Sequence, residues 1–186
     1  MRPVPDELLL NLAAIAATLL GLLVVGVFFY VETGLRRLEQ AQEPFGAFIR
    51  AASRLTMSLY GLTFSVSIAL VALKPAWARA TFALAAAGVL LATLDWTIRS
   101  RAMGAIMGSA VWSPLVAVVA WIWVAAMLAI PWVMGGLHPS REHLTWAVLL
   151  TMLTALVSTL EMLLSVFDIS AFEQASRLSG NREEPE

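Results

Sequence analysis

Five stretches of the chain are each apolar over about 20 residues, and this pattern limits the fold more than any other feature of the sequence. They lie at about 8–31, 55–73, 77–98, 114–134 and 144–167. A helix of this length crosses the ~30 Å hydrocarbon core of a bilayer and satisfies its own backbone hydrogen bonds. The sequence therefore predicts an all-α, polytopic membrane helical bundle with five transmembrane helices.

Composition supports this class and excludes others. Hydrophobic residues make up 60% of the 186 residues and charged residues only 13%, which is too apolar for an ordinary water-soluble domain. The absence of cysteine excludes disulfides, thiolate metal sites and thiol catalysis. The net charge of -1 and the scattered basic residues give no reason to expect nucleic-acid binding.

The basic residues predict the orientation. With the N-terminus outside and the C-terminus cytoplasmic, eight arginines fall on the inner side and four basic residues on the outer side, as the positive-inside rule favours. We expect a single transmembrane helical domain over 1–175 and a polar cytoplasmic tail over 176–186. The bias of 11 Arg to one Lys, with abundant Ala and Leu, suggests a bacterial inner (plasma) membrane. The inner set is Arg36, Arg37, Arg50, Arg54, Arg99, Arg101, Arg177 and Arg182, and the outer set is Arg2, Lys74, Arg79 and Arg141.

Polar residues form one stripe along the fifth predicted helix. Their spacings of 3, 4, 3, 4 and 3 place them on one helix face within an otherwise apolar segment. A carboxylate in hydrocarbon costs a few kcal/mol unless it has a partner, a water-filled cavity or a bound proton. The stripe is Thr151, Thr154, Ser158, Glu161, Ser165 and Asp168.

Within this stripe, Glu161 carries the strongest functional hypothesis. It lies about 10 Å along the helix axis from Asp168, so if Asp168 marks the interface, Glu161 is inside the apolar zone. In the functional interpretation, the stripe lines an ion pathway in which hydroxyls replace hydration and Glu161 is a cation or proton site. Thr154, Ser158, Ser165 and Asp168 complete that pathway.

A second interpretation of the stripe is structural. Ser and Thr hydroxyls bond between membrane helices, and small residues let helices approach closely. Small residues recur at helical spacing in the first three spans, which supports this interpretation. These ladders are Ala13, Ala17 and Gly21; Gly61, Ser65 and Ala69; and Ala83 with Ala87 and Gly88 with Ala92.

Charged residues near the inner ends of the spans predict a cytoplasmic charge belt of Glu32, Arg50, Arg54 and Asp95. Arg50 and Arg54 are four residues apart and share a helix face, where they can meet Asp95, Glu161 or Asp168. Partly buried ion pairs of this kind often specify how helices dock.

Two features fit the five-span scheme less simply. No charge occurs from 102 to 137, so 102–112 is expected to be a re-entrant segment beside a cavity or an amphipathic connector on the inner leaflet. Trp121 and Trp123 lie in the middle of the fourth span, where we expect packing residues rather than a cofactor site.

Enzymatic chemistry has little support. His138 and His143 flank a short loop, but their spacing matches no recognised metal site, and the spans contain no histidine for haem. No phosphate-binding loop and no nucleophile–base pair appears. We therefore expect no enzyme, no metal and no cofactor.

Two functions remain from different classes. The first is a homo-oligomeric ion channel or ion-conducting protein, since five helices leave little room for an aqueous pore within one chain. A path between subunits would place Glu161 in a ring of acids that favours cations. The second is a non-conducting structural or accessory subunit of a larger membrane complex, docked through its charge belt. The expected partners are the lipid bilayer, further copies of the chain and, for the first function, a cation.

Overall fold

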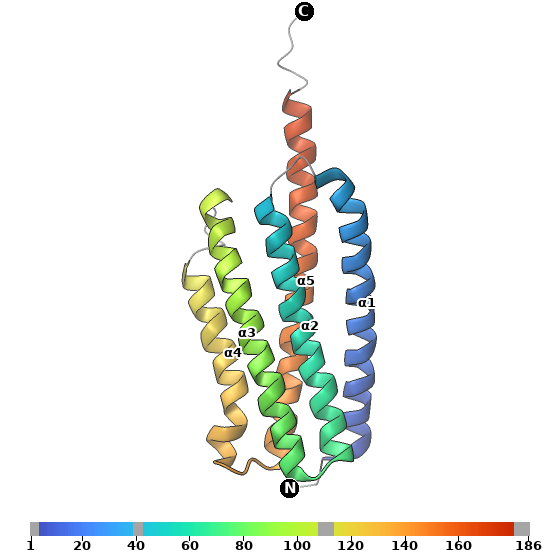
Figure 1. Ribbon diagram of the computed structural model, residues 1–186, viewed down its shortest axis with the longest axis vertical. Coiled ribbons are helices and arrows are strands. Elements are labelled where there is room, and N and C mark those ends of the chain that lie inside the picture. Colours follow the sequence, from blue (N-terminus) through green and yellow to red (C-terminus); the bar gives the residue numbers. More distant parts are fainter. Residues whose placement is uncertain (1–3, 39–42, 108–113, 181–186) are drawn as a thin grey trace, which may run out of the picture.

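The fold is a bundle of five long helices that run alternately up and down (Figure 1). The structure is a computed structural model that describes the backbone of residues 4–38, 43–107 and 114–180, and the side chains of 4–26, 47–101 and 117–164. The helices are α1 (Asp6–Leu38), α2 (Glu43–Ala72), α3 (Pro75–Met107), α4 (Pro114–Gly135) and α5 (Arg141–Gly180). All five are long and apolar enough to cross a membrane, as the sequence predicted.

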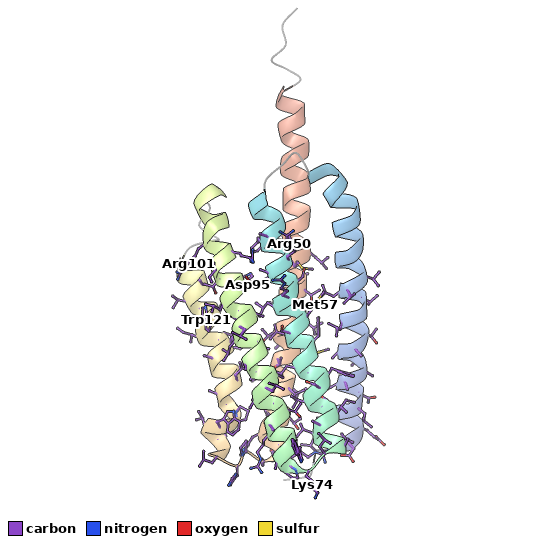
Figure 2. The ribbon with its side chains drawn as sticks, in the orientation of Figure 1. Arg50, Met57, Lys74, Asp95, Arg101 and Trp121 are labelled. Carbon is purple, nitrogen blue, oxygen red and sulfur yellow. The ribbon has the colours of Figure 1, made fainter. Side chains whose placement is uncertain are left out.

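The alternating direction places the start of α1 and the end of α5 at opposite ends of the bundle (Figure 1). One end holds the start of α1, the α2–α3 turn and the α4–α5 loop, and is called here the Lys74 end. The other holds the end of α1, the start of α2 and the end of α3, and is called the Arg50 end (Figure 2).

Most helices extend beyond the apolar stretches. Residues 102–107 continue α3 without a break, so the separate re-entrant or interfacial segment predicted over 102–112 is wrong for this part. Residues 108–112 lie outside the described residues. Arg99, Ser100 and Arg101 interrupt the apolar run, but these residues are compatible with a helix and continue the same backbone hydrogen bonds into 102–107.

Residues with capping chemistry mark several helix ends. Asp6 and Glu7 occupy the first turn of α1, where acidic side chains interact favourably with the helix dipole. Ser140 precedes α5 and accepts a hydrogen bond from the backbone N–H of His143 at 3.3 Å, which is the N-cap arrangement. Gly136 follows α4 with a φ of 59°, which glycine adopts at little cost.

Helix α2 is the centre of the bundle, since it packs against α1, α3 and α5, while α4 packs mainly on α5. Fully buried side chains fill the interior with apolar volume, including Leu59, Val66, Phe82, Met127 and Val148. The interior of the described residues is therefore closely packed along α2.

The small-residue ladders are mostly not used in this packing. Among their members, Ala13 and Ala69 are buried, whereas Ala17, Gly21 and Gly88 are exposed. A methyl group added at Gly21, Gly61 or Gly88 meets no atom within 4 Å. The ladder prediction was thus wrong at these positions, and other small residues, such as Ala16, Ala147 and Ala155, form the close contacts.

Candidate functional site

The hydroxyl stripe of α5 lies against α2 and α4 for most of its described length. Thr151 is fully buried and donates a hydrogen bond to the carbonyl of Ala147 at 2.7 Å. Thr154 is half-buried and accepts a hydrogen bond from the indole Nε1 of Trp123 at 3.0 Å. These two hydroxyls therefore take part in helix structure and helix packing.

Ser158 extends the same pattern to α2. Its Oγ lies 2.8 Å from Oγ1 of Thr56, which itself donates to the carbonyl of Ala52 at 3.0 Å. A hydroxyl has one proton, so Ser158 is the donor and Thr56 the acceptor of the interhelical bond.

A second polar contact between α2 and α5 escaped the sequence analysis. The phenolic oxygen of Tyr60 lies 3.0 Å from Oγ1 of Thr159, and Thr159 donates to the carbonyl of Ala155 at 2.8 Å. Tyr60 is fully buried, and a buried tyrosine hydroxyl usually has a hydrogen-bond partner. The signal in the sequence was therefore a tyrosine in the middle of an apolar span.

The two tryptophans of α4 link it to its neighbours. Nε1 of Trp121 donates to Oγ1 of Thr97 in α3 at 2.9 Å, and Trp123 donates to Thr154 in α5. Trp123 is exposed and Trp121 half-buried, so their role is to bridge helices from the bundle surface. The sequence predicted these two tryptophans as packing residues, but it did not predict that they donate hydrogen bonds to neighbouring helices.

Glu161 lies on the exposed surface of α5, next to the exposed Leu160 and Leu164. The neighbouring Met162 has its sulfur 3.5 Å from Oγ of Ser53 in α2. This contact places Glu161 at about the level of Ser53 and Arg54 along the bundle. Glu161 is therefore level with the predicted charge belt rather than deeper than it.

The last two residues of the predicted pathway are described less fully. Ser165 and Asp168 belong to the continuous helix α5, but their side chains lie outside the described residues. The same holds for Glu32 of α1. Their assignment to the pathway and to the charge belt stays a prediction.

The described part of the charge belt is built around Asp95. Its carboxylate pairs with Nη1 of Arg54 at 3.3 Å and with Nε of Arg99 at 2.7 Å. The side chains of Arg54, Arg99 and Asp95 are 63%, 39% and 30% exposed. Arg99 was not predicted to belong to the belt, although its spacing of four residues from Asp95 on one helix favours such a pair. Arg50 lies one turn from Arg54, with an exposed side chain at the same end (Figure 2).

Polar contacts at the Lys74 end join the helix ends. Arg141 at the start of α5 forms an ion pair with Asp6 at the start of α1. Arg79 of α3 lies 2.8 Å from Nδ1 of His138 in the α4–α5 loop. Among the residues searched in the described part of the chain, no three His, Asp or Glu side chains are grouped so as to hold a metal ion.

Together these observations define a five-helix bundle with an apolar, hydrogen-bonded interior and a basic cluster at one end. Comparison with protein-family models, with curated proteins and with solved structures gives no match.

Proposed function

We propose that the chain is a non-conducting structural subunit of a membrane assembly in the bacterial inner membrane. Five helices of sufficient length and hydropathy support the membrane location. The preference of basic residues for the cytoplasmic side supports an orientation in which the Arg50 end faces the cytoplasm.

The observation that carries this proposal is the use of the stripe hydroxyls within a single chain. Thr154 accepts from Trp123, and Ser158 donates to Thr56. Both side chains thus face neighbouring helices of the same chain, whereas a hydroxyl that replaces the hydration of an ion must face the ion path. These two hydroxyls instead stabilise the packing of α5 on α4 and α2.

The level of Glu161 also supports a structural role. A carboxylate level with Arg54 lies where charged side chains gather, and there it reaches water or headgroups at low cost. In this proposal Glu161 belongs to the charged layer through which the subunit docks on a second copy or a larger membrane protein.

A homo-oligomeric ion-conducting protein is the second candidate, and the exposure of Glu161 favours it. Glu161 is on the outer surface of α5, where an axis between copies of the chain can reach it. In a symmetric ring this position repeats once per subunit, which would form a ring of acids selective for cations. Ser165 and Asp168 would continue the pathway toward the cytoplasm.

Flux measurements in liposomes separate the two functions. We expect the purified wild type to give the same K⁺ and H⁺ flux as protein-free liposomes. The matched variants are Glu161→Gln and Glu7→Gln, since Glu7 is an exposed acid at the opposite end of the bundle. A wild-type flux that Glu161→Gln abolishes and Glu7→Gln preserves would contradict the structural role and establish the ion-conducting one.

A further inference from the structure

The two histidines of the chain lie close together in sequence at the Lys74 end, where α4 is joined to α5. His138 is an exposed residue of the α4–α5 loop, and His143 lies in the first turn of α5. The backbone N–H of His138 donates to the carbonyl of Gly135, the last residue of α4, at 3.3 Å. The proposed function gives neither imidazole a role.

His138 links the loop to α3 through an unprotonated nitrogen. Its Nδ1 lies 2.8 Å from Nη1 of Arg79. Arg79 is held on its own helix, since its Nε donates to the carbonyl of Pro75 at 3.1 Å. A guanidinium group can only donate hydrogen bonds, so Nδ1 of His138 is the acceptor. A proton on this nitrogen would replace the hydrogen bond with a contact between two cations.

Nδ1 of His143 also lies where a proton would lack an acceptor. This atom is buried and has no hydrogen-bond partner among the described atoms. It lies against the end of α4, since a Cβ atom added at Gly135 would be 2.7 Å from it. An imidazolium carries a proton on both ring nitrogens, and an unpaired buried cation costs more than an unpaired neutral group. The packing of both histidines therefore fits their neutral form.

No carboxylate in the described part of the chain forms an ion pair with either histidine. Asp6 pairs with Arg141, whereas Glu7 and Glu142 form no ion pair among the described contacts. The last turns of α2 and α4 bring no charged side chain to this end. The charge of an added proton would thus face the guanidinium of Arg79 without a compensating anion. The charged residues described at this end are Asp6, Glu7, Lys74, Arg79, Arg141 and Glu142.

The contact of Arg79 with His138 holds a part of the bundle that has few other links to α3. Helix α4 packs mainly on α5, and the indole of Trp121 bonds to Thr97 of α3 far from the loop. Pro131 lies inside α4 near its end and has no N–H to donate, so the last turn of this helix has one backbone hydrogen bond fewer. Loss of the contact with Arg79 would therefore free the loop and the end of α4 together.

We propose that Arg79 and His138 form a pH-sensitive latch, which holds the α4–α5 loop on α3 while the imidazole is neutral and releases the loop when the imidazole is protonated. Histidine is the side chain that ordinarily changes its charge between about pH 5 and 8. His143 adds to the response, because its protonation also opposes packing against Gly135. In the proposed orientation the latch faces the outside of the cell, and it is independent of whether the chain conducts ions.

The test is the mobility of a spin label on the loop, measured by electron paramagnetic resonance in detergent micelles at about pH 7.5 and about pH 5. The chain has no cysteine, so Leu137→Cys gives a single labelling site at an exposed loop residue. We expect the ratio of mobile to immobile label to rise about fivefold at the lower pH, as the loss of one hydrogen bond predicts. A label at Leu73→Cys, in the exposed α2–α3 turn, should not respond.

Two variants of the labelled chain separate the latch from other effects of acid. His138→Asn places an amide oxygen near the position of Nδ1 and does not titrate, so the label should stay immobile at both pH values. Arg79→Met removes the donor and should leave the label mobile at both. Equal mobility of the wild-type loop at the two pH values would overturn the proposal, as would a full pH response in His138→Asn. An equal response of the Leu73→Cys label would show general unfolding in acid and would contradict a local latch.

Discussion

Ser158 of α5 donates a hydrogen bond to Thr56 of α2, with 2.8 Å between the two oxygens. Thr56 is fully buried and its own proton is directed to the carbonyl of Ala52, so the two helices share a continuous chain of hydrogen bonds. The contact lies on the stripe that in sequence resembles an ion pathway. Polar residues on one face of a membrane helix therefore have two uses, and only the partner across the interface distinguishes them.

Removal of this bond should destabilise the bundle modestly. We expect Ser158→Ala to lower the free energy of unfolding by about 0.5–1.5 kcal/mol, the range for hydrogen bonds between membrane helices. Unfolding in mixed micelles of increasing SDS fraction measures this change. In a double-mutant cycle with Thr56→Val, the two effects should be non-additive, and additive effects would show that the hydroxyls do not interact. Thr18→Val is the control, since the exposed Thr18 donates its hydrogen bond to the carbonyl of Ala14 within its own helix.

Tyr60→Phe isolates the second polar contact between α2 and α5. The ring stays buried while the hydroxyl that donates to Thr159 is lost, so we expect a loss of about 1 kcal/mol in the same unfolding assay. Phe82→Ala, which leaves a cavity at a fully buried position, should cost about 3–5 kcal/mol. Equal losses in the two variants would contradict the core position assigned to Phe82.

Gly135 ends α4 at a close approach to the next helix. A Cβ atom there would lie 2.7 Å from Nδ1 of His143 and 3.1 Å from Cβ of Pro139. Gly135→Ala should therefore lower the free energy of unfolding by about 1–3 kcal/mol, as overpacking does. Adding His143→Ala should restore part of the loss.

Gly88→Ala is the matched control for this prediction. Gly88 lies within α3, and an added methyl group there meets no atom within 4 Å. Alanine favours a helix over glycine by about 1 kcal/mol, so this variant should be as stable as the wild type or more stable. A destabilised Gly88→Ala would indicate that another chain covers this surface.

Ser67 is fully buried in α2, and its hydroxyl has no hydrogen-bond partner among the described atoms. Replacing an unsatisfied buried hydroxyl removes a desolvation penalty, so Ser67→Ala should leave stability unchanged or increase it by up to about 1 kcal/mol. Ser158→Ala is the comparison, since it removes a hydroxyl that is bonded. If Ser67→Ala destabilises the bundle as much as Ser158→Ala does, a bound water or another group satisfies this hydroxyl.

Asp95→Asn removes two ion pairs that are partly exposed. An exposed ion pair contributes about 0.2–1 kcal/mol, and salt screens it. We expect a small loss of stability at low ionic strength that shrinks at about 1 M salt. Glu7→Gln, an exposed acid with no ion pair among the described contacts, should show no such salt dependence. A loss independent of salt would indicate that Asp95 acts through packing instead.

The five helices could be predicted because crossing hydrocarbon imposes a length and a composition that the sequence displays directly. The full extent of α3 could not, since Arg99, Ser100 and Arg101 separate residues 102–107 from the apolar span that precedes them. The start of α4 could be predicted to the residue, since the expected span of 114–134 begins at Pro114, and proline suits the first position of a helix.

The pairing of polar side chains was harder to predict. Spacing placed Thr154, Ser158 and Glu161 on one face of α5, but a face includes neighbours on either side, and α4 and α2 approach it at different positions. Tyr60 and Thr159 are 99 residues apart, and nothing local relates them. The level of Glu161 depends on how far α5 is shifted along α2, which is set by contacts such as Ser53 with Met162.

The central place of α2 has a consequence for synthesis. Ser158 follows its partner Thr56 by 102 residues and Thr159 follows Tyr60 by 99, so α2 is synthesised well before its partners in α5. The hydroxyl of Thr56 already has a hydrogen-bond partner before α5 is made, because it donates to the carbonyl of Ala52 in its own helix. The phenol of Tyr60 acquires its bond to Thr159 only once α5 has been made. The contact between α2 and α5 is thus completed only after Thr159 has been made, and a chain that stops short of Thr159 leaves the Tyr60 hydroxyl without this partner.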